Sequence, residues 1–164
     1  MKTQEEIFTE LVHMYSEKLY WHVRSIVGTH DDADDIVQDS FAKAWKSLPG
    51  FRGDSDYFTW LWRISTNEAV NFLRKKKLRS YLPLSGRDDV ARDVAGDCSF
   101  DGDEATLKLY KAIDALPARQ KSVFCMRYFE ELPYSRIAEI TGVSESSLKA
   151  SYHIAAEKVK IKLS

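Results

Sequence analysis

Residues 57–77 combine side chains that could bind a nucleic-acid strand. Wound as a helix at about 100° per residue, the stretch separates into an apolar and a polar side. On a polar side of this kind, cations meet phosphates, amides read base edges, and an aromatic ring stacks on a base. An ordinary amphipathic helix with a solvated polar side gives the same pattern, so both interpretations stay open here. The predicted strand-binding side comprises Trp60, Arg63, Asn67, Val70, Asn71, Arg74 and Lys75.

The opposite side of the same helix is predicted to pack into a core. Trp60 and Trp62 lie about 200° apart around a helix, so both cannot be buried. We expect Trp62 to be buried. Trp60 either faces DNA or the linker, or is a partly exposed packing residue. The apolar side comprises Phe58, Leu61, Trp62, Ile64, Ala69, Phe72 and Leu73.

Charge is strongly segregated along a chain of 164 residues that carries 24 basic and 25 acidic side chains. Residues 50–82 and 107–164 each have four more basic than acidic side chains, whereas residues 83–106 have five more acidic ones. This pattern indicates two anion-binding modules joined by an acidic tether.

The apolar spacing predicts an all-α fold of two small helical domains joined by a flexible linker. The first domain, residues 1–81, contains a helix over 4–27 that ends at Gly28 and a helix capped by Asp31 or Asp32, whose apolar stripe includes Trp45. Pro49 and Gly50 stop that second helix, and the third runs to about residue 80. The linker covers residues 82–104, and the second domain, residues 105–164, has predicted helices over 105–116, 118–129, 134–141 and 145–161.

The last two predicted helices have helix-turn-helix spacing. Ala138 allows close approach, Gly142 makes the turn, Ser144 caps the recognition helix, and Leu148 packs inward. Thr141 stands where a larger apolar residue is usual. The residues expected to face DNA are Ser146, Ser147, Lys149, Ala150 and His153.

Other chemistries find little support in the sequence. Cys98 and Cys125 have no partner at metal-ligand spacing, and free thiols fit a reducing compartment. The run Asp31–Asp35 matches the magnesium-binding DDxxD pattern, but aspartates at a helix start more often complement the helix dipole. We found no nucleophile–base pair and no phosphate-binding glycine loop. We therefore expect no metal, no cofactor and no catalytic site, and, without an apolar run of membrane length, a cytoplasmic protein.

Three blocks in order give the chain a family resemblance. Asp34–Trp45 resembles region 2.2 of the extracytoplasmic-function (ECF) sigma factors of bacterial RNA polymerase. Phe58–Asn67 with Arg74–Lys77 is similar to their regions 2.3 and 2.4. Leu116–Phe124 and Tyr134–Glu139 resemble region 4. The resemblance implies promoter-directed transcription initiation, with region 2 capturing the unwound minus-ten strand and region 4 binding the minus-thirty-five duplex.

The resemblance also implies roles for particular residues. The exposed side of the second helix would bind core polymerase through Asp35, Gln38, Asp39, Ala42 and Lys43. The loop Phe51–Tyr57, which includes Phe51, Arg52 and Asp54, would hold a flipped base. The acidic linker would thread toward the polymerase active centre through Asp88, Asp89, Asp93, Asp97, Asp101, Asp103 and Glu104. An anti-sigma factor is an implied further partner.

The predicted recognition helix departs from the family because it has no arginine after Ser147, which removes bidentate arginine–guanine contacts. Arg136 and Lys158 are candidate phosphate contacts. Two other classes of function stay open at this point. A standalone helix-turn-helix regulator would not need the region 2 blocks, and a helical adaptor would bind protein alone.

Overall fold

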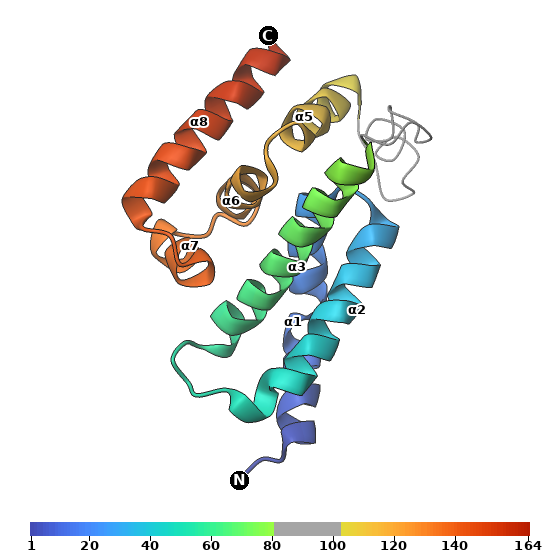
Figure 1. The fold of residues 1–164 in the computed structure, drawn as a ribbon, viewed down its shortest axis with the longest axis vertical. Helices are drawn as coiled ribbons and strands as arrows, with labels where there is room; N and C mark the ends of the chain where they lie inside the picture. Colours follow the sequence, from blue (N-terminus) through green and yellow to red (C-terminus); the bar gives the residue numbers. More distant parts are fainter. Residues whose placement is uncertain (81–102) are drawn as a thin grey trace.

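A computed structural model describes residues 1–80 and 103–164, and every regular element in those two ranges is helical (Figure 1). The N-terminal half holds α1 (Gln4–Val27), α2 (His30–Ser47), the 3-10 turn η1 (Leu48–Gly50) and α3 (Tyr57–Ser80). The C-terminal half holds α5 (Glu104–Asp114), α6 (Ala118–Tyr128), α7 (Tyr134–Thr141) and α8 (Glu145–Leu163). The predicted all-α class is confirmed for these residues, and the predicted linker lies largely outside them.

The helix ends follow local backbone chemistry. Gly28 ends α1 with φ of 94°, a left-handed conformation that glycine adopts without steric cost. The prediction that Asp31 or Asp32 caps α2 is wrong, because the cap is Thr29, whose hydroxyl oxygen accepts from the Asp32 backbone N–H. Thr29 takes the extended backbone of a cap, which moves both aspartates into the first turn, where they complement the helix dipole. At the start of α5, Asp103 is the cap, so the helix begins inside the predicted linker.

The first three helices form a bundle around apolar side chains. α1, α2 and α3 pack against one another, and Leu19, Leu61 and Trp62 are among the fully buried side chains. The predicted burial of Trp62 is confirmed, since its side chain is 1% exposed. Trp45, predicted within the apolar stripe of α2, is 38% exposed, and its ring lies edge-on to that of Phe8 at a centroid distance of 5.2 Å.

The C-terminal half packs directly on this bundle. α6 and α7 lie against α3, α6 also lies against α1, and α8 forms the outer layer on α5, α6 and α7 (Figure 1). One apolar cluster joins Leu19 and Leu61 to Val123 and Met126, and a second joins Val23 to Cys125. The two halves therefore share their cores.

The packing of α6 and α7 on α3 explains why one prediction from the sequence is wrong. Val70, predicted on the polar side of α3, is 3% exposed. It lies only about 80° around the helix from Trp62. α6 and α7 pack on a further side of α3, next to the sides that contact α1 and α2. The buried part of the α3 surface is therefore wider than packing against α1 and α2 alone would make it.

None of the helices in the described ranges has the length and hydropathy needed to cross a bilayer.

A buried ion pair gives a test of this packing. Lys121 on α6 and Asp114 at the end of α5 form an ion pair in which the side chains are 3% and 11% exposed. We expect Asp114→Ala to lower the free energy of unfolding by about 3–5 kcal/mol, because it leaves a buried ammonium group unpaired. Urea unfolding at neutral pH measures the change.

The double variant Lys121→Met/Asp114→Leu should recover most of that loss, since apolar side chains of similar volume can replace a buried pair. Asp35→Ala, an exposed site on α2, is the matched control. Equal destabilisation by Asp114→Ala and Asp35→Ala would contradict the prediction.

Candidate nucleic-acid interface

Five of the seven predicted strand-binding residues of α3 form an exposed stripe, whereas Trp60 is half-buried and Val70 is buried. Counting about 100° per residue from the buried Trp62, Arg63 and Arg74 lie about 100° and 120° around the helix. Asn67 and Asn71 lie about 140° and 180° from it on the same count. All four are exposed, as is Lys75, which continues the stripe toward the basic end of α3. Two amides lie between cations along one helix face, an arrangement suited to a strand whose phosphates and base edges both need contacts.

Aromatic rings gather at the other end of this stripe. Phe51 stacks on Tyr57 with ring centroids 4.5 Å apart, and its centroid lies 5.2 Å from that of Trp60. All three rings are half-buried, while Arg52 and Asp54 in the same loop are exposed. A partly open aromatic group beside a cation can stack on an unpaired base.

The helix-turn-helix is built as the spacing predicts. Gly142 has φ of 76° and donates its N–H to the Ala138 carbonyl, and Ser144 caps α8 by accepting from the Ser147 N–H. Leu148 is 1% exposed and anchors the second helix. The five residues predicted to face DNA are all exposed: Ser146, Ser147, Lys149, Ala150 and His153.

Thr141 has a local role that a larger apolar residue could not fill. Its hydroxyl donates to the Ile137 carbonyl at 2.8 Å, and the same oxygen accepts from the Val143 N–H at 3.2 Å. The threonine thereby satisfies a backbone donor inside the turn, which holds α8 in its angle to α7.

Contacts between the halves occupy part of the predicted interface. Arg63 donates from Nη2 to the Glu139 carbonyl at 2.5 Å, so the last turn of α7 holds its guanidinium. Arg136, predicted to contact phosphate, instead forms an ion pair with Asp56 at 2.6 Å and a hydrogen bond with Thr59 at 2.8 Å. Burial opposes ionisation of Asp56, but the hydrogen bonds from Arg136 and Thr59 outweigh it and lower the pKa of this carboxyl.

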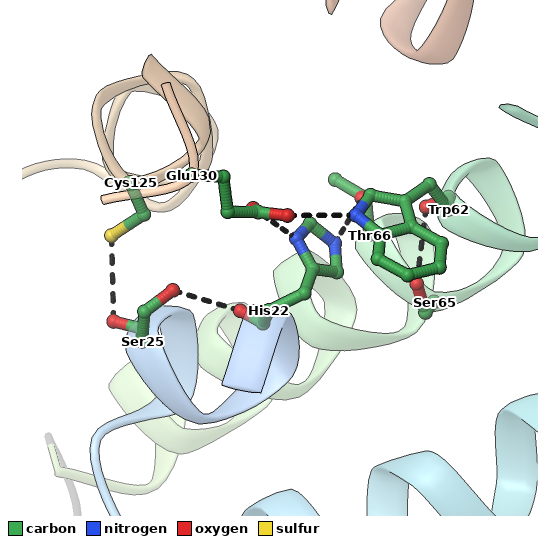
Figure 2. Close-up of polar contacts among 7 residues, drawn as sticks. All are labelled: His22, Ser25, Trp62, Ser65, Thr66, Cys125 and Glu130. Atoms are coloured by element: carbon green, nitrogen blue, oxygen red, sulfur yellow. Dashed lines mark hydrogen bonds and ion pairs between the residues drawn. The ribbon is translucent and has the colours of Figure 1, made fainter. Parts of the chain in front are cut away.

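A polar network that the sequence analysis does not predict lies at the centre of this contact (Figure 2). His22 is fully buried between Glu130 and Thr66. Glu130 also accepts from the Trp62 indole N–H at 2.9 Å. The available signal was the place of His22 on the apolar stripe of α1, where a polar ring needs a buried partner.

The predicted polymerase-binding residues share one exposed face of α2. Asp35, Gln38, Asp39, Ala42 and Lys43 are all exposed. Lys43 pairs with Glu68 of α3, and Gln38 donates to Asp34 at 3.1 Å. The face is acidic at its start, and the partly exposed Trp45 lies at its edge, about 20° around the helix from Gln38.

A metal interpretation of the aspartates finds no support in the described ranges. They contain no group of three or more His, Cys, Asp or Glu side chains that could hold a metal ion. Cys125 is buried, and burial raises the pKa of its thiol to about 12, whereas Cys98 lies outside the described residues.

Comparisons with known proteins agree across both halves. Residues 11–79 match the family described as Sigma-70 region 2, and residues 106–159 match Sigma-70, region 4. The chain is 30% identical over 162 residues to RNA polymerase sigma factor SigV of Bacillus subtilis (strain 168), covering 99% of this chain and 94% of that protein. It is 27% identical over 171 residues to ECF RNA polymerase sigma factor SigW of the same organism, covering 99% and 91%.

Two solved structures share the fold. The sigma factor RpoE, in complex with the anti-sigma factor NepR from Bartonella quintana, matches with a TM-score of 0.69 and 22% identity, over 95% of this chain and 96% of that one. CnrH, in complex with the cytosolic domain of CnrY, matches with a TM-score of 0.65 and 23% identity, over 95% and 86%.

The turn between α7 and α8 gives a direct test of the helix-turn-helix. We expect Thr141→Val to lower the free energy of unfolding by about 1 kcal/mol, because the Val143 N–H loses its acceptor. Urea unfolding measures this change, and Thr9→Val, at an exposed site on α1, is the control. A Thr141→Val protein as stable as the unsubstituted chain would show that the hydroxyl is dispensable.

Proposed function

The chain belongs to the ECF sigma factors of bacterial RNA polymerase, and on that premise we propose which of its surfaces bind core polymerase and which bind promoter DNA. A protein of this family binds core polymerase and directs it to specific promoters. The polymerase supplies the chemistry, and the sigma factor acts by binding. We place this activity in the cytoplasm, with core polymerase, promoter DNA and an anti-sigma factor as partners.

The exposed stripe of α3 is the observation that carries the proposal for strand capture. Arg63, Arg74 and Lys75 would neutralise phosphates of the unwound minus-ten strand, while Asn67 and Asn71 would hydrogen-bond to base edges. The aromatic group at the start of the helix would receive an unstacked base. Arg52 and Asp54 lie exposed at the rim of that group and would contact the same nucleotide.

The exposed start of α8 would bind the minus-thirty-five duplex. Hydroxyls of Ser146 and Ser147, the Lys149 ammonium and the His153 ring can hydrogen-bond to bases or phosphates, and the Ala150 methyl can contact a thymine methyl. Because these exposed positions include no arginine, we propose recognition that leans on A·T pairs and groove shape rather than on guanine. Arg136 could reach phosphate only after leaving Asp56.

The exposed face of α2 would bind core polymerase. α2 lies on the side of the N-terminal bundle away from α6, α7 and α8 (Figure 1). If this face of α2 binds core polymerase, the exposed stripe of α3 can bind DNA at the same time. One structural neighbour, the sigma factor RpoE, was solved with the anti-sigma factor NepR, which supports adding such a partner here.

Run-off transcription tests the proposed function as a whole. Core polymerase, this chain and a library of templates with randomised upstream sequence should yield transcripts that share a minus-ten and a minus-thirty-five element. A standalone regulator would instead bind free duplex and give no product with core alone. Product that is independent of the added chain would contradict the proposal.

Substitutions in the α3 stripe should separate DNA opening from polymerase binding. We expect Asn67→Ala to reduce open-complex formation by about tenfold, because one good amide–base contact contributes about 1–3 kcal/mol. Core affinity should not change. Permanganate reactivity of unpaired thymines and fluorescence anisotropy with labelled core measure the two effects.

Arg63→Gln should behave in the same way, with Arg119→Gln, an exposed site at the start of α6, as its matched control. If either stripe variant lost core binding and promoter opening to the same extent, α3 would not be the strand-reading surface.

Charge reversal on α2 tests the polymerase-binding face. We expect Gln38→Lys/Asp39→Lys to weaken core affinity by at least about tenfold through lost contacts and like-charge repulsion. The control His13→Lys/Glu17→Lys adds a comparable charge to an exposed face of α1. Unchanged core affinity in the α2 variant would reject the assignment.

A further inference from the structure

An isoleucine lies exposed on the outward side of α8. Ile154 is 49% exposed, although an apolar side chain of this size is usually buried. Leu148, Ala155 and Val159 are 1%, 0% and 5% exposed and pack into the two apolar clusters. These three side chains fix the rotation of α8, so Ile154 cannot turn inward. Counting about 100° per residue from Leu148, it lies about 120° around the helix.

Ile154 continues the side of α8 that we assign to DNA. On the same count and in the same direction, Ser147 lies about 100° and Ala150 about 160° from Leu148. Ser147, Ala150 and Ile154 are all exposed. They follow the spacing i, i+3, i+7, which brings side chains onto one helix face. The proposed duplex-binding side therefore extends one helical turn past Ala150, and the side chain at its end is apolar.

The length of this face matches the spacing of base pairs. With a rise of 1.5 Å per residue, Ser147 and Ile154 lie about 10.5 Å apart along α8. Successive base pairs are about 3.4 Å apart, so this length covers about three base-pair steps. The major groove, about 12 Å wide, admits a helix. A helix that lies along the groove with Ser147 against one base edge can thus place Ile154 against an edge about three steps away.

The chemistry of the groove selects the base that suits this side chain. Thymine places its C5 methyl group in the major groove, whereas guanine and adenine present hydrogen-bonding groups there, and cytosine presents an amino group. Ile154 has no donor or acceptor, so packing against those groups would leave them without a partner. Packing against a methyl group removes apolar surface of both molecules from water.

The next turn of α8 separates Ile154 from the rest of the exposed apolar surface. Glu157 is exposed three residues further on, and the phosphates of a duplex repel a carboxylate. Ile161, which is 71% exposed, lies beyond this turn. Ile154 is therefore on the same side of the charged turn as Ala150, and Ile161 is a matched apolar residue outside the duplex-binding part of the helix.

We propose that Ile154 reads a thymine methyl group in the minus-thirty-five element and is a specificity-determining residue of α8. This inference rests on the proposed binding of α8 to that element. It assigns part of the base readout to an apolar contact at a position that the helix-turn-helix spacing did not identify. It also requires a thymine about three base-pair steps from the base that Ser147 faces.

Deoxyuridine isolates the methyl contact, because it pairs as thymidine does but lacks the C5 methyl group. Promoters obtained from the randomised templates supply the minus-thirty-five element. Each of its thymines is replaced in turn, and fluorescence anisotropy measures the Kd of core polymerase with this chain for the fluorescein-labelled duplex. We expect about fourfold weaker binding when the thymine at Ile154 is replaced, which is the effect of one buried methyl group.

Removal of the isoleucine should remove that dependence. Ile154→Ala should bind the unmodified promoter at least about fourfold more weakly, and it should no longer distinguish thymine from deoxyuridine at that one position. Alanine favours helix, so the variant should keep its fold, which far-UV circular dichroism checks. Ile161→Ala should keep the Kd of the parent chain and its dependence on each methyl group.

A change of chemistry at this position should change the preferred base. Ile154→Arg supplies a guanidinium that can donate two hydrogen bonds to guanine O6 and N7. With this variant, the transcripts from randomised templates should show guanine in place of thymine at that position and no change elsewhere in the element. Ile161→Arg should yield the same element as the parent chain. A residue that acts only on helix stability would not change the preferred base.

The possible contrary outcomes point to different errors. The same dependence on deoxyuridine in the parent and in Ile154→Ala, or an unchanged preferred base in Ile154→Arg, would overturn the inference and leave the proposed role of α8 intact. Weaker affinity of Ile154→Ala for core polymerase itself would show that this side chain contacts protein, and would also overturn it. Transcripts that share no minus-thirty-five element would reject the proposed role of α8, and this inference with it.

Discussion

The burial of Trp62 in the middle of α3 is the constraint on which the other features depend. Its ring stacks on Phe58 at a centroid distance of 4.0 Å, lies 5.8 Å from Tyr15, and is 1% exposed. An aromatic side chain fixed on several sides sets the rotation of its helix. Once that rotation is set, helical geometry alone turns Arg63 and Asn67 outward. The proposed strand-binding stripe is thus positioned by core packing rather than by contacts among its own residues.

Local features of the sequence were enough to predict the helices and most residues of their exposed faces. Gly28 and Gly142 end helices because they can take positive φ, and Ser144 caps α8 through a neighbouring N–H. Interactions of this kind involve residues a few positions apart, so spacing reveals them. The cap at Thr29 was missed because two aspartates nearby offered an equally plausible local choice.

Contacts between distant segments could not be predicted in the same way. His22 and Glu130 are 108 residues apart, and no local pattern links a histidine on an apolar stripe to one particular carboxylate. The burial of Val70 and the engagement of Arg136 with Asp56 also depend on how the second half packs on the first. Interpreting the sequence one helix at a time therefore predicts the helices of each half, but not the contacts between the two halves.

The central claim is that the exposed stripe of α3 grips the unwound minus-ten strand, and site-specific crosslinking tests it most directly. A photo-crosslinking amino acid in place of Asn71 would report what lies against the stripe in an open complex formed with core polymerase. We predict a crosslink to the non-template strand within the melted minus-ten element. A crosslink to the template strand, or to protein alone, would contradict the account.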